Sequence, residues 1–374
     1  PKAKEMISRL RDILIAAKNT GIGTGLTMIA NEAYGNSPIE LRADQTFPGT
    51  RNIRGGYGVE LCPNKPGAKE LMLRWREELF SVFSDIGIDY IGVGPYDQGG
   101  CCCSKCNPWG SNGYLLMAKE ISNLAHKYWP ESKFILSTWL FDIEEWEGLT
   151  KAFASRPDWV DYIEADSHTD FPLYPLKCGV PGDLPLLNFP EISMWGMSPW
   201  GGFGANPMPN RLQKLWEQVS NVISGGSPYS EGIFEDINKA IISQFYWENK
   251  KAVETLAEYI SFEYSPEITA EVLKAIEIIE KNHKFFPADG SYGTVEDAGA
   301  DEAYDCLKKA ELKLSPSIRD SWRWRILFLR AMIDRERFRN KGLLTETCEE
   351  AFRELTRIYH AENAEPQVAP PKRK

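Results

Sequence analysis

The sequence lacks the motifs and apolar runs that mark several large classes of protein. Its 374 residues contain no Gly-x-Gly-x-x-Gly or Gly-x-x-x-x-Gly-Lys phosphate loop, no Gly-x-Ser-x-Gly elbow and no His-Glu-x-x-His pair. A nucleotide-binding open sheet, a serine hydrolase and a zinc peptidase therefore have no support. No stretch reaches the ~18 uninterrupted apolar residues of a membrane helix, so we expect no membrane partner.

Positive charge is also scarce. The formal net charge is -10, and the clearest basic cluster is the C-terminal "PKRK". Binding to a nucleic-acid backbone requires a concentrated basic face. We therefore expect no nucleic-acid partner.

The eight cysteines do not follow the spacing of a disulfide framework. Four crowd into one loop, at Cys101, Cys102, Cys103 and Cys106, and the other four are scattered. Cys101, Cys103 and Cys106 could supply three thiolates to a metal, but a closed structural site needs four ligands, and only a distant residue such as His126 or His168 could complete it. We expect packing of small side chains and no cofactor, with a disulfide or a metal site as alternatives.

Six apolar runs, each followed by a loop and a helical pattern, indicate an α/β fold with parallel strands. The runs are "GLTMIANEAY", "DYIGVGPYDQGG", "KFILSTWLFD", "WVDYIEAD", "LPLLNFPEISMWG" and "SGGSPYSEGI". Nearly all of them end in acids: Glu32, Asp97, Asp142, Glu164 with Asp166, Glu191 and Glu231. In a (β/α)8 TIM-type barrel the carboxyl ends of all strands meet on one face, where these acids would surround one pocket.

Six units, with a possible further short strand at "GVELCP", fall short of the eight that a barrel needs. Because the chain opens inside an amphipathic helix, we expect the first strands to lie upstream, so that an upstream segment or a subunit would complete the barrel. After residue 262 the pattern becomes purely helical. The predicted organisation is an N-terminally incomplete barrel domain at 1–262, a helical bundle at 263–364 and a disordered Pro-rich tail at 365–374.

The loop after the second run carries a family resemblance. The segment "PYDQGGCCCSKCNPWG", with the upstream "ELCPNKPGAKELML" and the downstream "PYSEGIFEDINKAIISQFYW", resembles large bacterial glycoside hydrolase barrels distantly related to the β-N-acetylhexosaminidase and α-glucuronidase superfamily. The resemblance covers roughly residues 25 to 265. It implies cleavage of glycosidic bonds, with the acid at the end of the fourth barrel strand, here Asp97. Gln98 follows Asp97 where the hexosaminidases have an Asp-Glu pair, which puts chemistry assisted by an acetamido group in doubt.

Glycoside cleavage needs two carboxylates facing each other across the scissile bond. Asp97 and Glu191, at the proposed fourth and seventh strand ends, form the first candidate pair, in an order that the sequence leaves open. Glu231, at the end of the last strand, is the third catalytic candidate. An alternative pair is Glu32, preceded by Asn31, with Glu164 as the nucleophile.

Further polar and aromatic residues near strand ends are candidates for binding sugar hydroxyls and ring faces. They are Asn31, Glu32, Tyr96, Trp139, Glu164, Asp166, His168, Trp195, Trp200 and Tyr229. The sequence thus predicts a glycosidase that degrades a poly- or oligosaccharide, a role that favours a periplasmic or extracellular location. The alternatives are a non-catalytic carbohydrate-binding barrel and a metal-dependent enzyme that uses the cysteine cluster.

Overall fold

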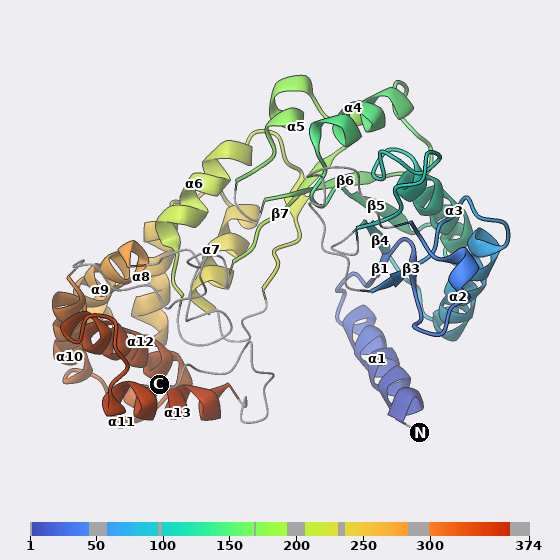
Figure 1. Cartoon of the computed structure of the whole chain (residues 1–374). Coiled ribbons are helices and arrows are strands. Elements are labelled where there is room, and N and C mark those ends of the chain that lie inside the picture. The colour runs from blue at the N-terminus through green and yellow to red at the C-terminus, as the bar shows by residue number, and fades with distance from the viewer. Residues whose placement is uncertain are drawn as a thin grey trace. The chain divides into compact units, whose positions relative to one another are not determined.

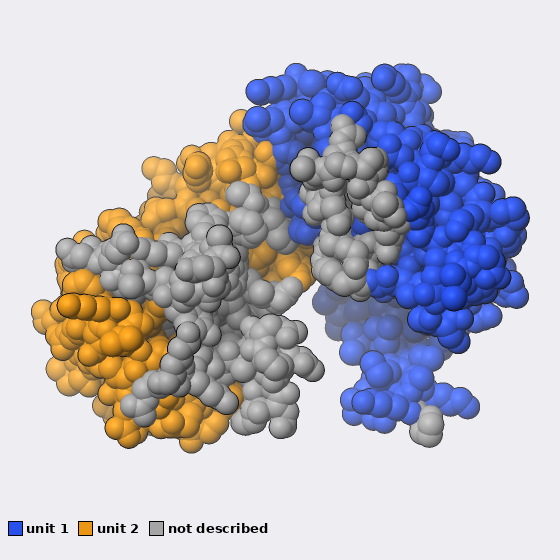
Figure 2. All heavy atoms as spheres, in the orientation of Figure 1, with its two compact units in different colours: residues 1–166, 172–188, 222–225 blue, residues 167–171, 189–221, 226–374 orange. Residues whose placement is uncertain are grey.

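The computed structural model describes residues 2–44, 58–95, 99–167, 170–192, 206–230, 236–282 and 299–359. The chain divides into two compact units (Figure 2). Unit 1 comprises residues 1–166, 172–188 and 222–225, and unit 2 comprises residues 167–171, 189–221 and 226–374. The predicted boundary at residue 262 between a barrel and a helical domain stays a prediction.

A six-stranded parallel sheet runs through the chain (Figure 1). Its strands are β1 (Gly25–Ile29), β4 (Tyr90–Gly94), β5 (Lys133–Ser137), β6 (Tyr162–Asp166), β7 (Leu186–Phe189) and β8 (Gly225–Gly226), adjacent in that order. Each of the six predicted runs contributes one strand, and the neighbours follow chain order. The mixed α/β class with a parallel sheet is therefore confirmed.

The two faces of this sheet differ in burial. One face is apolar and packed against other side chains, because its residues are 0% exposed: Ile91, Val93, Leu136 and Ile163. Because side chains alternate along a strand, Glu164 and Asp166 lie on the opposite face of β6 and are half-buried. The alternation brings carboxylates to one face of the carboxyl end of the sheet.

One helix of unit 1 precedes its first strand, and the others come after strands. They are α1 (Lys2–Asn19), α2 (Ala68–Phe83), α3 (Gly113–Tyr128), α4 (Ile143–Ala152) and α5 (Leu173–Cys178), with the 3-10 turns η1 (Ile39–Leu41) and η2 (Pro181–Asp183). Tyr114, at the start of α3, is fully buried, and its hydroxyl lies within hydrogen-bonding distance of the carbonyls of Val93 (2.6 Å) and Ser137 (2.7 Å). This one side chain therefore fixes α3 to the ends of β4 and β5.

The short strand predicted at "GVELCP" exists but does not join the parallel sheet. It is β3 (Val59–Glu60), which pairs antiparallel with β2 (Glu32–Ala33) in a separate two-stranded sheet. The segment between β1 and α2, which contains β2 and β3, therefore lies outside the main sheet, and we call this segment the excursion. Leu61 and Asn31 tie this excursion to the end of β1, because the Leu61 amide donates to the Asn31 carbonyl at 3.1 Å.

Helices dominate unit 2, as the sequence predicts for residues beyond 262. They are α6 (Pro209–Val219), α7 (Asp236–Trp247), α8 (Ala252–Glu263), η3 (Pro266–Ile268), α9 (Thr269–Lys281), α10 (Ala300–Glu311), α11 (Pro316–Arg319), α12 (Trp322–Arg339) and α13 (Glu346–Ile358). Ser265, Ser315 and Thr345 cap three of these elements, because each side chain accepts a hydrogen bond from a backbone amide in the first turn. Among the described helices, none combines the length and apolar character needed to cross a membrane.

Candidate functional site

In unit 1, neighbouring strands are aligned at their carboxyl ends across β1, β4, β5 and β6. Ile29 is aligned with Gly94, and Ser137 is aligned with Glu164. Pairing continues past the strand ends, since the Ala30 amide donates to the Gly94 carbonyl (3.1 Å) and the Thr138 amide to the Glu164 carbonyl (2.8 Å). Among the described residues, those directly after β1 and β5 are therefore paired with the end of the neighbouring strand.

At the end of β1 the structure separates Asn31 from Glu32. Asn31 is fully buried, and its Nδ2 donates to the Leu61 carbonyl at 3.1 Å, while its Oδ1 has no hydrogen-bond partner among the described residues. Glu32 begins β2, has an exposed side chain and lies near the partly buried Arg76, whose guanidinium donates to the Ile29 carbonyl at 2.8 Å. Burial lowers the pKa of Arg76, and the charge of Glu32 opposes that shift.

The loop after β5 carries a half-buried Trp139 and a structural carboxylate. Asp142 accepts a hydrogen bond from the Glu145 amide (2.9 Å), and Glu145 accepts one from the Asp142 amide (3.1 Å), which forms a capping box at the start of α4. The arrangement explains why an acid follows this strand. Asp142 has a capping role, in contrast to the expectation that every strand-end acid belongs to the pocket.

The loop from Gly99 to Gly110 follows β4 and is held at both ends by buried carboxylates. Glu60, 2% exposed, accepts from the Gly100 amide at 2.9 Å, and Glu145, 5% exposed, accepts from the Gly110 amide at 2.7 Å. The indole of Trp109 fills the space against Gly100. Sequence reasoning missed both carboxylates, because each comes from a different part of the chain and only the folded loop brings it close.

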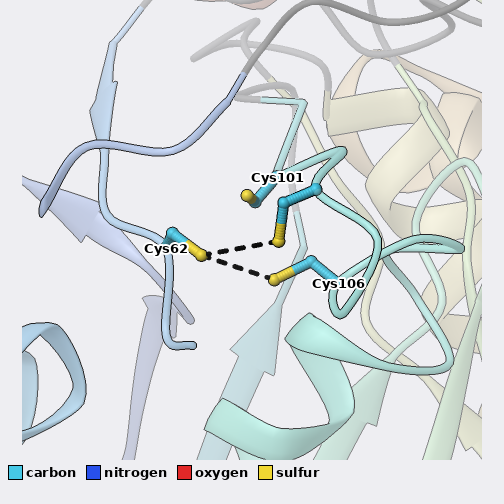
Figure 3. A group of neighbouring side chains, drawn as sticks. Cys62, Cys101 and Cys106 are labelled. Carbon is cyan, nitrogen blue, oxygen red and sulfur yellow. Dashed lines mark hydrogen bonds between the residues drawn. The ribbon is translucent and has the colours of Figure 1, made fainter. Parts of the chain in front are cut away.

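Four cysteine sulfurs gather at this loop. Figure 3 labels three of these cysteines, Cys62, Cys101 and Cys106. The Sγ atoms of Cys62, Cys101, Cys103 and Cys106 all lie within 4.8 Å of one another. Cys62 follows β3, and its sulfur is 3.7 Å from that of Cys106 and 3.8 Å from that of Cys103. The structure therefore adds a fourth sulfur to the three that the sequence singled out, and it comes from Cys62 rather than from a histidine.

These thiols have unequal proton affinities in the protein without a metal. Burial raises the pKa of Cys62 to about 11, whereas a hydrogen bond with Cys106 lowers the pKa of Cys101 to about 5. Cys102 is different, since its thiol donates to the Asp44 carbonyl at 2.8 Å. The sulfur of Cys102 is thus engaged outside the four-sulfur group.

In unit 2, Glu191 and Tyr229 lie side by side where the chain continues beyond β7 and β8. The two residues form an isolated parallel bridge, in which the Tyr229 amide donates to the Pro190 carbonyl (2.8 Å) and the Ile192 amide to the Tyr229 carbonyl (3.0 Å). Glu191 is 3% exposed. Two residues predicted independently for the site are therefore brought together.

Glu191 also lies close to a partly buried arginine. Burial lowers the pKa of Arg211, at the start of α6, and the negative charges of Glu191, Asp170 and Glu280 oppose the shift. Glu280 accepts hydrogen bonds from the amides of Asn210 (3.1 Å) and Arg211 (2.8 Å) and so fixes the start of this helix. The arginine is a site residue that the sequence analysis missed.

A buried polar network supports the segment that carries Glu191. The Asn238 amide group donates to the carbonyls of Ile192 and Asn206, both at 2.7 Å, and Arg330, which is 0% exposed, donates to the Asn206 side chain at 2.6 Å. The contacts of Asn238 therefore fix the backbone next to Glu191.

Several predicted site residues lie outside the described residues. They are Tyr96, Asp97, His168, Trp195, Trp200 and Glu231. The predicted pairing of Asp97 with Glu191, and the position of Glu231 beside them, therefore stay predictions. A small cavity lined by Asn206, Asp236, Tyr259, Trp322 and Arg323 has room for about one water molecule and cannot hold a sugar.

Comparison with known proteins identifies relatives by fold. No family model and no curated protein sequence matches the chain. The family GH115 4-O-methyl-α-glucuronidase BtGH115A, with specificity for decorated arabinogalactans, is 12% identical with a TM-score of 0.59, over 96% of this chain and 50% of its own. The family 89 glycoside hydrolase CpGH89 from Clostridium perfringens, in complex with its substrate GlcNAc-α-1,4-galactose, is 15% identical with a TM-score of 0.56, over 90% of this chain and 41% of its own.

A third solved structure, an O-GlcNAc hydrolase from Thermobaculum terrenum, is 10% identical with a TM-score of 0.51, over 95% of this chain and 77% of its own. The chain thus spans half or less of the length of the first two proteins. At these identities the likeness concerns the fold. The resemblance stated from the sequence is confirmed at that level: the chain shares its fold with glycoside hydrolases.

Proposed function

We propose that the chain contains the catalytic barrel region of a glycoside hydrolase that cleaves a poly- or oligosaccharide with two carboxylates. The observation that carries the proposal is the setting of Glu191. It is 3% exposed, forms a parallel bridge with Tyr229 beyond the ends of β7 and β8, and lies near the Arg211 cation. A buried carboxylate at the carboxyl end of a parallel strand is where barrel enzymes place catalytic groups.

The three acids at the ends of β4, β7 and β8 would share the chemistry. We assign Glu191 the role of the ionised carboxylate, nucleophile or base, because the nearby positive charge of Arg211 attracts an anion. Asp97 would then be the acid that protonates the leaving oxygen, and Glu231 would lie beside them. The residues Asn31, Glu164, Asp166, His168 and Tyr229 would bind sugar hydroxyls, with Tyr96, Trp139, Trp195 and Trp200 against ring faces.

The finer architecture belongs to the same proposal. We infer that the six-stranded sheet is part of a (β/α)8-type barrel and that the helices after residue 262 form a bundle. The unbroken chain-order arrangement of the strands supports this inference, because a barrel of repeated βα units places each new strand beside the previous one.

The fold relatives guide the choice of substrates. One is a 4-O-methyl-α-glucuronidase with specificity for decorated arabinogalactans, and another is a family 89 glycoside hydrolase in complex with its substrate GlcNAc-α-1,4-galactose. A first panel therefore contains aryl α-glucuronides, aryl α- and β-N-acetylglucosaminides, decorated arabinogalactan and GlcNAc-α-1,4-galactose. Release of reducing sugar or aryl alcohol is the readout.

The test compares single carboxylate variants with a matched surface variant. Glu191→Gln, Asp97→Asn and Glu231→Gln each remove one acidic oxygen at nearly constant volume. Glu267→Gln makes the same chemical change at an exposed residue of η3. We expect Glu191→Gln and Asp97→Asn to lower kcat by about 10²- to 10⁴-fold, the size of a general acid or base contribution, while Glu267→Gln leaves kcat unchanged.

Circular dichroism checks that each variant is folded. Full activity of Glu191→Gln on a substrate that the parent chain cleaves would exclude Glu191 from the chemistry. Binding of oligosaccharides by calorimetry, with no turnover of any substrate in the panel, would instead favour a non-catalytic carbohydrate-binding barrel.

A further inference from the structure

The four-sulfur group formed by Cys62, Cys101, Cys103 and Cys106 joins two segments that are distant in sequence. Cys62 lies in the segment after β3, and the other three lie in the loop after β4 (Figure 3). We propose that these four cysteines bind one Zn²⁺ ion as thiolates in a closed structural site. This inference does not depend on the proposed glycosidase activity.

The distances between the sulfurs match a tetrahedral ion. With a Zn–S bond of about 2.3 Å, the edge of a ZnS₄ tetrahedron is about 3.8 Å. The Cys62 sulfur lies 3.7 Å from that of Cys106 and 3.8 Å from that of Cys103, and all four sulfurs lie within 4.8 Å of one another. Small side-chain rotations therefore suffice to place four ligands around one ion.

Disulfide bonding does not account for this arrangement. A disulfide requires two sulfurs about 2.05 Å apart. All eight cysteines of the chain are free in the structure, and two of the cluster's separations already equal a tetrahedral edge. The Cys62 sulfur lies at nearly the same distance from two other sulfurs. Ligands of one metal ion are arranged in this way, whereas a disulfide would bring Cys62 close to one sulfur only.

The surroundings of the sulfurs resemble an outer shell around metal-bound thiolates. Asn64 Nδ2 donates to the Cys106 sulfur at 3.2 Å, and hydrogen bonds of this kind orient and stabilise ligands. The backbone around the group is also fixed, because the amides of Cys106 and Asn107 both donate to the Cys103 carbonyl, at 2.9 Å and 3.0 Å. Cys62, Cys101 and Cys106 are buried, at 1%, 0% and 0% exposure.

The ligand set selects the metal and its role. Four thiolates in tetrahedral geometry favour zinc or iron over magnesium or calcium, which prefer oxygen ligands. Four protein ligands leave no position for water or substrate, so the site is structural rather than catalytic. The metal would connect the excursion that contains β2 and β3 to the loop after β4.

The test measures metal in the full chain purified without a metal-binding tag. We expect about one zinc ion per chain by plasma mass spectrometry in the parent protein, and less than about one tenth in Cys62→Ser. The matched control is Cys178→Ser, an exposed cysteine outside the group, which should retain zinc. Cys62→His, which replaces one zinc ligand by another, should restore most of the zinc that Cys62→Ser loses.

A second measurement covers the case in which Cys62→Ser does not fold. Replacement of zinc by Co²⁺ in the parent chain should give the intense visible bands of a tetrahedral thiolate site, and X-ray absorption should show four sulfur neighbours. Less than about one tenth of a metal ion per parent chain would overturn the proposal. Stoichiometric iron, or disulfides among the four cysteines by intact mass under non-reducing conditions, would overturn the zinc assignment.

Discussion

Substitution of Gly100 by alanine tests how tightly the loop after β4 is packed. Gly100 has φ +83°, and a Cβ built there would lie 2.4 Å from Cγ and Cδ2 of Trp109. The indole cannot shift freely, because Trp109 is 2% exposed and a Cβ on Gly113 would lie 2.4 Å from its Cζ3. The added methyl group therefore meets a side chain that is enclosed on two sides.

The expected cost combines two effects. An alanine in the left-handed region is strained by about 1–2 kcal/mol. Overpacking in a dense core adds about 1–3 kcal/mol. The free energy of unfolding should therefore fall by about 2–5 kcal/mol in Gly100→Ala. Gly21 is the matched control, because it has φ +78° and nothing within 4 Å of its built Cβ, so Gly21→Ala carries the strain without the collision.

Urea denaturation of both variants and of the parent chain measures the difference. We expect Gly100→Ala to lose about 1–3 kcal/mol more than Gly21→Ala. In the double variant with Trp109→Leu, the cost of Gly100→Ala should shrink to the strain alone, which a double-mutant cycle reports as a favourable coupling. Equal losses in the two glycine variants, within about 0.5 kcal/mol, would refute the packing argument.

Two further predictions concern the same unit. Tyr114→Phe removes the hydroxyl that links α3 to the carbonyls at the ends of β4 and β5, so it should lower the free energy of unfolding by about 1–2 kcal/mol in urea, whereas the exposed Tyr34→Phe should not change it. The ion pair with Lys18 (2.8 Å) holds the pKa of Asp89 below its usual 3.8. The resulting stabilisation is present above pH ~4 and is lost as the pH falls through the lower pKa that Asp89 has in the folded protein. Asp89→Asn should therefore flatten the dependence of the free energy of unfolding on pH in this acidic range. An unchanged dependence in that range would contradict the prediction.

Local patterns in the sequence were sufficient for the strands and helices. Each of the six runs singled out in the sequence contains one strand of the parallel sheet, and the helical pattern beyond residue 262 matches the helices found there. Both signals depend on neighbouring residues only. The two-residue strand β3 was visible for the same reason, but its partner was not, because the choice between the main sheet and β2 depends on where the excursion folds.

Residues of the candidate site could be named from the sequence only where they follow strands. Glu191 and Tyr229 were both named from sequence, and the structure aligns them. Cys62, Glu60 and Glu145 escaped notice, because nothing near them in the sequence indicates a loop at residues 99–110 as their partner. Asp142 shows the opposite error, since a strand-end acid became a helix cap within its own turn.

Three independent restraints act on the ten residues that follow Gly100. A buried carboxylate accepts a hydrogen bond from the Gly100 amide and another accepts one from the Gly110 amide. Between these two points, three cysteine sulfurs of the loop lie together with that of Cys62. Asp97 precedes Gly100 by three residues, and a catalytic acid loses rate steeply when it is misplaced by about 1 Å. A loop with eleven backbone units would not hold such precision through its own hydrogen bonds, because each connecting residue adds conformational freedom. Anchoring both ends and the centre removes that freedom, which gives the cysteine cluster a mechanical role in the loop that begins shortly after Asp97 in the sequence.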